Sequence, residues 1–172
     1  MLDQDHVRRH HHELAHLIGR FVVDHMVRLR GACDGDVLAG IVLGSIAQHN
    51  LRRFYEEVVP RSGETLDALI ARGAHLPHLR SSNAMSVSAS TGIPRETVRR
   101  KIKWLAARGW VRHEGRDKLY VTEAAGLHFA DFDVQSVDRF HVAAVRVASV
   151  VADRGRSEGG GAPPASVAAR LR

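Results

Sequence analysis

The chain has 172 residues, of which 44% are hydrophobic and 26% charged; this suits one globular domain, or a small domain with helical extensions, and excludes two large domains or wholesale disorder. Its single cysteine, Cys33, excludes an intramolecular disulfide, and its longest apolar run, over residues 37–47, is too short to span a bilayer. Because the chain does not open with a basic end followed by an apolar run, we expect an intracellular, cytoplasmic protein with no membrane partner.

The N-terminal part, residues 1–54, is predicted to be a helical dimerisation or packing region. Apolar residues three or four apart predict one long amphipathic helix from about residue 5 to residue 30. A second helix, capped by Asp36 and ending near Phe54, is apolar around most of its circumference, so it must be buried on several sides. Gly40 and Gly44 share one face of this helix, where another helix could approach closely.

Residues 55–81 are predicted to form a linker that contains a short helix. Pro60 and Gly63 indicate a loop, and the helix then covers residues 64–73 with Gly73 as its C-cap. Three apolar residues of this helix are expected to point inward: Leu66, Leu69 and Ile70.

The next segment predicts two helices joined by a turn. Residues 83–91 form a short helix, Gly92 and Ile93 form the turn, and Pro94 starts a second helix that ends near Arg108. Val98, Ile102 and Leu105, together with Ile93 of the turn, should face the core. The opposite face and the exposed N-terminal end carry charged residues: Arg95, Glu96, Arg99, Arg100 and Lys103.

A hairpin and further helices are predicted to complete the chain. Two short strands lie within residues 110–121, around a turn at residues 114–117. Thr122 can cap a short helix, and a separate amphipathic helix follows within a C-terminal region at residues 131–152. Residues 153–172 are rich in Gly, Pro and Ala and are expected to be a disordered tail.

The net charge of +6 is concentrated in one segment. Nine basic and three acidic residues lie between Arg95 and Lys118, so the rest of the chain is formally neutral. A concentrated basic patch attracts phosphate and releases counterions on binding, which indicates nucleic acid. A merely solvated basic face is the alternative interpretation.

Residues 82–129, with the run VSASTGIPRETVRRKIKWLAARGWV followed by RHEGRDKLYVTEAAG, resemble the winged helix-turn-helix transcription regulators. The resemblance implies a mainly α fold with a small β-hairpin wing, in which a winged helix-turn-helix core at residues 82–130 is flanked by N- and C-terminal dimerisation helices. RETVRR is similar to the DNA-reading helix of the cyclic-AMP receptor protein family, whereas YVTEAAG is similar to the junction after the wing in MarR-type (multiple antibiotic resistance) regulators.

The resemblance implies a sequence-specific transcription regulator of bacterial or archaeal type, located in the cytoplasm at the nucleoid. It would bind double-stranded DNA as a homodimer on a pseudopalindromic operator. It carries base contact over to Arg95, Glu96 and Arg100, and phosphate contact to Thr97. We add Arg99 to the base-reading residues, and assign the DNA backbone to four further cations: Lys103, Arg112, Arg116 and Lys118.

Glu96 favours sequence readout over charge attraction alone. Arginine can donate twice to guanine, and a glutamate on the same face can accept from cytosine N4. A carboxylate in a purely phosphate-binding patch would only repel its ligand. The alternative is an ordinary helical charge pair between Glu96 and Arg99 or Arg100.

Other functions were weighed against DNA binding. A winged helix can also bind protein or RNA. The chain has no nucleophile elbow, phosphate-cradling glycine loop or HExxH motif, so we expect neither an enzyme nor a cofactor. The sequence leaves open whether a small-molecule effector binds between the long helices and the winged domain. The N-terminal histidines could be metal ligands or simply a polar surface, and we assign no metal site to them: His6, His10, His11, His12 and His16.

Overall fold

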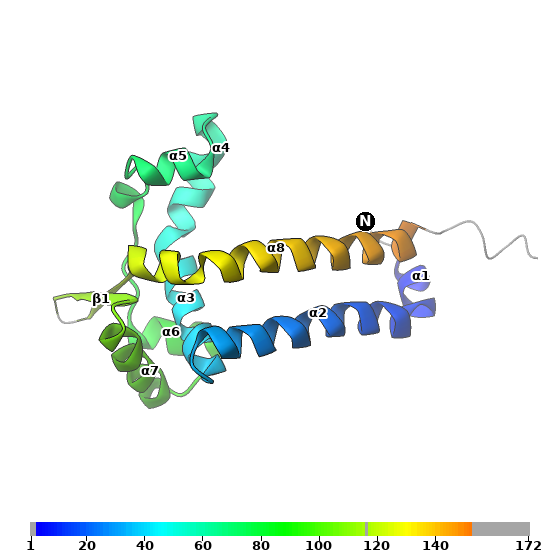
Figure 1. Cartoon of the computed structure of the whole chain (residues 1–172), viewed down its shortest axis with the longest axis horizontal. Helices are drawn as coiled ribbons and strands as arrows, with labels where there is room; N and C mark the ends of the chain where they lie inside the picture. The colour runs from blue at the N-terminus through cyan, green and yellow to red at the C-terminus, as the bar shows by residue number, and fades with distance from the viewer. Residues whose placement is uncertain (1–2, 116, 153–172) are drawn as a thin grey trace, which may run out of the picture. The chain divides into compact units, whose positions relative to one another are not determined.

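The computed structural model describes residues 3–115 and 117–152, which are mainly helical with one small antiparallel hairpin (Figure 1), as the sequence predicts. The chain divides into two compact units. We call the described residues 3–23 and 137–152 the arm, and residues 24–136 the body. The elements in chain order are α1 (Gln4–Arg9), α2 (His11–Ala32), α3 (Val37–Arg53), η1 (Phe54–Val58), α4 (Val59–Ser62), α5 (Leu66–Ala71), η2 (Leu76–His78), α6 (Ala84–Thr91), α7 (Arg95–Ala107), β1 (Val111–Glu114), β2 (Lys118–Val121) and α8 (Glu123–Ala152).

Two predicted helix boundaries are wrong. The single N-terminal helix is divided into α1 and α2 at His10, and Asp3 caps α1 by accepting a hydrogen bond from the backbone N–H of Asp5 at 3.0 Å. The two predicted C-terminal helices are one helix, α8, so the expected boundary after residue 130 falls within it. The described part of the chain has no proline between residues 122 and 152, and a single glycine such as Gly126 costs a helix only about 1 kcal/mol. The predicted disordered tail lies outside the described residues.

The arm contains α1, the first part of α2 and the last part of α8. Phe21 of α2 meets Phe140 of α8 edge to face, with ring centroids 5.5 Å apart. Near the chain's beginning, the Nε2–H of His6 donates to the carbonyl oxygen of Val150 at 2.8 Å. The two long helices are therefore antiparallel neighbours within the arm.

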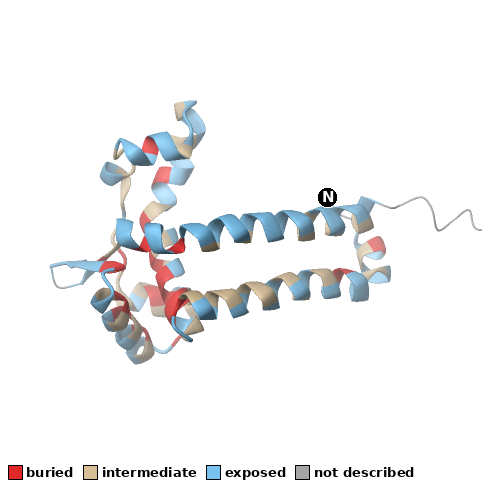
Figure 2. Ribbon diagram, viewed as in Figure 1, coloured by how far each residue is buried: buried red, intermediate tan, exposed pale blue. Residues whose placement is uncertain are grey.

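The core lies in the body, where α3, α6, α7, the hairpin and the start of α8 meet, and Figure 2 shows the buried residues gathered there. The predicted inward residues of α7 are buried, and Ile93 of the turn joins them. Asn83 caps α6 by accepting from the N–H groups of Met85 and Ser86, and Gly92 ends α6 in the left-handed region at φ 70°. The two predicted helices joined by a turn are therefore confirmed.

Helix α3 begins at its predicted cap, Asp36, and packing against α2 accounts for one of its two glycines, Gly40. Asp36 accepts a hydrogen bond from the N–H of Ala39 at 3.1 Å. A Cβ atom added at Gly40 would lie 2.7 Å from Cδ1 of Leu29, so α2 approaches here as predicted. A Cβ added at Gly44 would meet nothing within 4 Å, so the predicted close approach at this second glycine is wrong within the protomer.

Alanine at these two glycines should have opposite effects on stability. Gly44→Ala should raise the free energy of unfolding by about 0.5–1 kcal/mol, because alanine favours the helix and the site is open. Gly40→Ala should be less stable than Gly44→Ala by about 1–3 kcal/mol, because the Leu29 side chain must leave its packed position. Urea unfolding of both variants measures this difference, and equal effects would contradict it.

Residues 55–81 are more helical than a linker. α3 continues through the π-helical turn η1 into α4, so the predicted loop at Pro60 is wrong. Pro60 is tolerated because it lies in the first turn of α4, where its missing N–H is not needed for a helical hydrogen bond. In α5, Leu69 is fully buried as predicted, whereas Ile70 is exposed. Among the described helices, none has the length and apolar character needed to cross a membrane.

Candidate nucleic-acid interface

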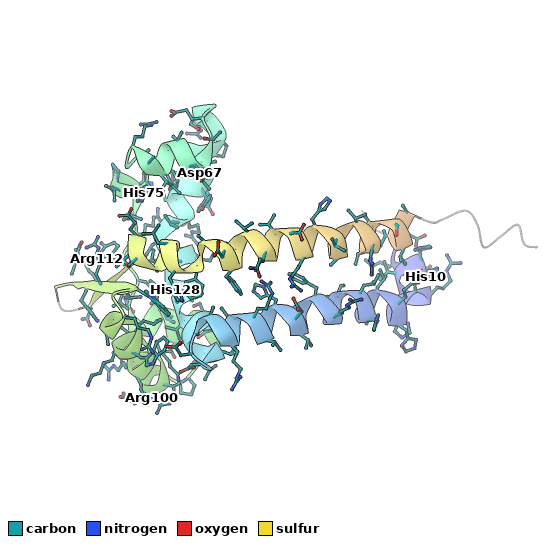
Figure 3. The ribbon with its side chains drawn as sticks, viewed as in Figure 1. His10, Asp67, His75, Arg100, Arg112 and His128 are labelled. Carbon is teal, nitrogen blue, oxygen red and sulfur yellow. The ribbon has the colours of Figure 1, made fainter. Side chains whose placement is uncertain are left out.

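Helix α7 carries its predicted charged residues on the side away from the core. Val98, Ile102 and Leu105 hold one face of the helix in the core. Arg100, labelled in Figure 3, is exposed on the outer side of α7. The other predicted base-reading residues, Arg95, Glu96 and Arg99, and the predicted phosphate contact Lys103 are exposed as well, whereas Thr97 is half-buried.

Glu96 and Arg99 form an ion pair on this exposed face. Their Oε2 and Nη1 atoms are 3.4 Å apart, and their side chains are 85% and 53% exposed. The helical charge pair weighed from the sequence is therefore present. Such an exposed pair contributes only about 0.3–0.5 kcal/mol, so both side chains remain available to another ligand at little cost.

Two cations of the basic segment lie on a third side of α7 and pair with the turn between α2 and α3. Lys101 donates to a carboxylate oxygen of Asp36, and the Nη2 atom of Arg108 lies 2.5 Å from Oδ2 of Asp34. The Arg108 guanidinium also lies over the Trp104 ring, 3.4 Å from its centroid. The charge that α7 presents to solvent is therefore smaller than the charge counted along the sequence.

These ion pairs anchor α7 to the end of α2 and the start of α3, and they were not predicted from the sequence. The available signal was the acidic turn CDGD at residues 33–36, together with Lys101 and Arg108 seven residues apart on α7. Seven residues is about two helical turns, so both cations point the same way.

The ionisation of Asp36 reflects this anchoring. Burial opposes the charged form, but the hydrogen bond from Lys101, the N–H groups of the helix start and the charge of Lys101 together lower the pKa of Asp36 below its ordinary value. The neighbouring Cys33 is buried, and burial together with the charges of Asp36 and Asp34 raises the pKa of its thiol to about 11. At neutral pH the carboxylate is therefore charged and the thiol is protonated and unreactive.

Asp36→Asn should remove a pH-dependent part of the stability. Asparagine caps helices as well as aspartate, so the substitution removes the charge and largely keeps the cap. A lowered folded-state pKa gives stability that is present above the unfolded value of about 3.9 and is lost as the pH falls through the folded pKa. The variant should be less stable than wild type at pH 7, and the gap should narrow by pH 3.

Urea midpoints at pH 7, 5, 4 and 3 measure this gap, with Asp67→Asn on the exposed start of α5 as the matched control. A gap between wild type and Asp36→Asn that stays constant over this pH range would contradict the assignment.

The hairpin follows α7 closely and carries the remaining predicted cations. Arg112 hydrogen-bonds to Glu114 on the same strand and lies over the ring of Tyr120, 4.6 Å from its centroid. Lys118 is exposed opposite Glu114 in the strand register. Arg112 is therefore positioned by neighbours within the hairpin, and Figure 3 shows its place there. Arg116 lies outside the described residues.

Asn50 attaches the hairpin to α3 and was not singled out from the sequence. Its side chain is fully buried. The Nδ2 group donates to the carbonyl oxygens of Arg80 and Leu119 at 2.6 and 3.1 Å, and Oδ1 accepts from the N–H of Val121 at 2.8 Å. Ser82 adds backbone hydrogen bonds to Leu119 in both directions. One buried amide thus positions β2, and nothing in the sequence sets Asn50 apart from its polar neighbours Gln48 and His49.

Trp110 links α7, the hairpin and α8. Its ring lies 5.6 Å from Trp104, 4.3 Å from His128 and 5.3 Å from Phe129, measured between centroids. His128 in turn donates from Nε2 to the carbonyl oxygen of Ala32 at 3.0 Å. These contacts fix where the hairpin starts relative to the exposed face of α7.

The N-terminal histidines contact one another as aromatic rings. His6 lies against His10 with centroids 4.5 Å apart, and His11 lies against His12 at 3.8 Å. Within residues 3–115 and 117–152, no group of three or more His, Cys, Asp or Glu side chains could hold a metal ion.

Compared with known proteins, the chain matches no protein-family model, no curated protein and no solved structure. What the site can do follows from its own residues. A helix with one face fixed in the core presents exposed guanidinium groups beside one carboxylate, and a two-stranded hairpin with further cations follows it directly.

Proposed function

We propose that this protein is a sequence-specific DNA-binding transcription regulator with a winged helix-turn-helix body. The observation that carries the proposal is the composition of the exposed face of α7, where Arg95, Arg99 and Arg100 surround Glu96. Positive charge attracts the phosphate backbone, whereas a carboxylate gains energy only from donors on base edges. The proposal therefore assigns base reading to this face.

In the proposed complex, α7 enters the major groove and the hairpin lies beside it. Arg100 donates to guanine O6 and N7, and Glu96 leaves Arg99 to accept from cytosine N4. Lys103 and Lys118 bind phosphate, while Arg112 keeps its contacts with Glu114 and Tyr120 and presents its remaining donors. Lys101 and Arg108 stay with the turn between α2 and α3, so they hold α7 in place and do not bind DNA.

We further propose a homodimer in which each protomer reads one half-site of a pseudopalindromic operator. Two α7 helices related by a twofold axis would fit half-sites about 34–36 Å apart, one turn of the double helix. The proposal places the protein in the prokaryotic cytoplasm, at the nucleoid.

Selection from a random pool of duplex DNA tests the proposal. We expect an enriched sequence with inverted half-sites, and a steep loss of affinity for nonspecific duplex as salt rises. A shallow salt dependence without an enriched sequence would overturn it in favour of a protein-binding winged helix. Preferential retention of single-stranded or structured RNA in a parallel selection would overturn it in favour of RNA.

A further inference from the structure

The exposed face of α7 carries one hydrogen-bond acceptor among several donors. Five side chains of this face are exposed between residues 95 and 103: Arg95, Glu96, Arg99, Arg100 and Lys103. Arginine and lysine side chains can only donate hydrogen bonds, whereas an ionised carboxylate can only accept them. Within residues 95–103, all of which the structure describes, Glu96 is therefore the one exposed side chain that can bind a donor on a ligand.

The Glu96 carboxylate is accessible to such a donor. Its side chain is 85% exposed, and its Oε2 atom lies 3.4 Å from Nη1 of Arg99, which is longer than a typical hydrogen bond. An exposed pair of this kind is weak, so a donor on a ligand can replace Arg99 at little cost. Glu96 lies in the first turn of α7, next to Arg95 and one turn before Arg99 and Arg100. The acceptor and the donors therefore face the same ligand.

Only two groups on the base edges of the major groove can donate to a carboxylate. These are the N4 amino group of cytosine and the N6 amino group of adenine. Adenine places its N7 acceptor beside N6, so a carboxylate bound to N6 also meets a lone pair that repels it. Cytosine has a C–H group in the equivalent place, and its guanine partner offers acceptors to neighbouring arginines. The arginines around Glu96 therefore favour a cytosine in a G·C pair.

Cytosine has only one N4 hydrogen to give to Glu96, because the other is used in base pairing with guanine. When N4 carries a methyl group, pairing retains the remaining hydrogen and the methyl group points into the major groove. The donor is then replaced by an apolar group that faces a carboxylate, and a desolvated acceptor without a partner is costly. A methyl group at C5 of cytosine, in contrast, leaves the N4 hydrogen in place.

Helix α7 is held so that it cannot shift away from such a methyl group. Val98, Ile102 and Leu105 are buried in the core on its inner side. On a third side, Lys101 and Arg108 form ion pairs with the turn between α2 and α3. Movement of the helix would break these contacts, so the cost of a modified base stays in the complex with DNA.

We infer that this protein binds only DNA in which the cytosine read by Glu96 is unmodified at N4, so that N4-methylation of this cytosine switches binding off. The inference rests on the proposed function and adds a chemical state of the DNA to which the same site responds. A purely electrostatic site would be indifferent to this modification, because it changes neither the charge nor the spacing of the phosphates.

The test uses the full-length protein and the DNA sequence enriched by selection. N4-methylcytosine replaces each cytosine of a half-site in turn, on either strand, and 5-methylcytosine at the same positions is the modification that keeps the N4 donor. Fluorescence anisotropy measures the Kd of wild type, Glu96→Ala and the control Glu56→Ala. Glu56 is matched to Glu96 because it is 65% exposed and pairs with an arginine of its own helical segment, Arg52, at 3.9 Å.

We expect N4-methylation at one position to weaken the binding of wild type and of Glu56→Ala by about five- to 150-fold. 5-Methylation at that position should have a much smaller effect. Glu96→Ala should bind the N4-methylated and the unmodified duplex with equal affinity, because the side chain that needs the N4 donor is gone.

The inference would be overturned if wild type bound every N4-methylated duplex as tightly as the unmodified one. An equal loss for wild type and Glu96→Ala would also overturn it, since the methyl group would then act through the duplex and not through the carboxylate. So would an enriched half-site without a G·C pair. If selection enriches no sequence, the proposed function fails and this inference fails with it, whereas an enriched sequence whose binding ignores N4-methylation rejects the inference alone.

Discussion

Asn50→Leu should lower the free energy of unfolding by about 3 kcal/mol. Leucine has a similar size but cannot replace the three hydrogen bonds that Asn50 makes with Arg80, Leu119 and Val121. The partners that are left without a hydrogen bond each cost about 1–3 kcal/mol where they are buried, and the added apolar burial offsets part of that cost. Urea unfolding at pH 7 measures the change.

Gln48→Leu is the matched control, because Gln48 lies on the same helix, is exposed and receives the same new side chain. Its effect should stay within about 0.5 kcal/mol of wild type. Amide hydrogen exchange at Val121 should also become faster in Asn50→Leu, since its N–H loses the Oδ1 acceptor. Equal stability of the two variants would show that the hairpin is held by its backbone hydrogen bonds alone.

Arg100→Ala and Glu96→Ala should each cost about 1–3 kcal/mol in affinity for the selected DNA sequence, which is about five- to 150-fold. Each should also relax the preference at a single base position, because the side chain that reads that base is gone. Lys118→Ala should instead weaken binding to all DNA sequences alike. It should also reduce the slope of log affinity against log salt by the amount that corresponds to about one phosphate contact. Fluorescence anisotropy with single-base variants of the selected site measures these effects.

Arg61→Ala on α4 controls for the loss of one positive charge, since this residue belongs to no element of the proposed interface. If Arg100→Ala, Glu96→Ala and Lys118→Ala all lowered affinity uniformly across sequences, the base-reading assignment would be wrong. Glu96→Ala distinguishes base reading from charge attraction most directly. Base reading predicts weaker binding, whereas in a purely electrostatic site the removal of a negative charge would strengthen binding.

The two helices around Gly92 were predictable because their signals are local. Asn83 and Pro94 start helices, Gly92 permits a left-handed turn, and Val98, Ile102 and Leu105 repeat at helical spacing. Each of these preferences acts within a few residues of the chain. The exposed charged face of α7 followed from the same periodicity, so its residues were placed correctly although their ligand stays a proposal.

The predictions about residues 55–81 and the chain's two ends were less successful. Pro60 was interpreted as a loop because proline usually interrupts helices, yet its place at the start of α4 makes its missing N–H harmless. The break between α1 and α2, and the absence of a break in α8, likewise lack a strong local signal such as proline. Helix boundaries of this kind depend on packing.

The sequence by itself determined the mainly helical character, the hairpin, and the position of the basic segment along the chain, because composition and periodicity are properties of neighbouring residues. Only the tertiary structure decided which of those charges pair with distant parts of the chain. Asp34 and Asp36 form ion pairs with Arg108 and Lys101, although Arg108 itself is exposed. The same holds for Asn50, whose three partners lie 30 to 71 positions away in sequence. Pairings over such distances are set by how helices pack, and a single sequence carries no local record of them.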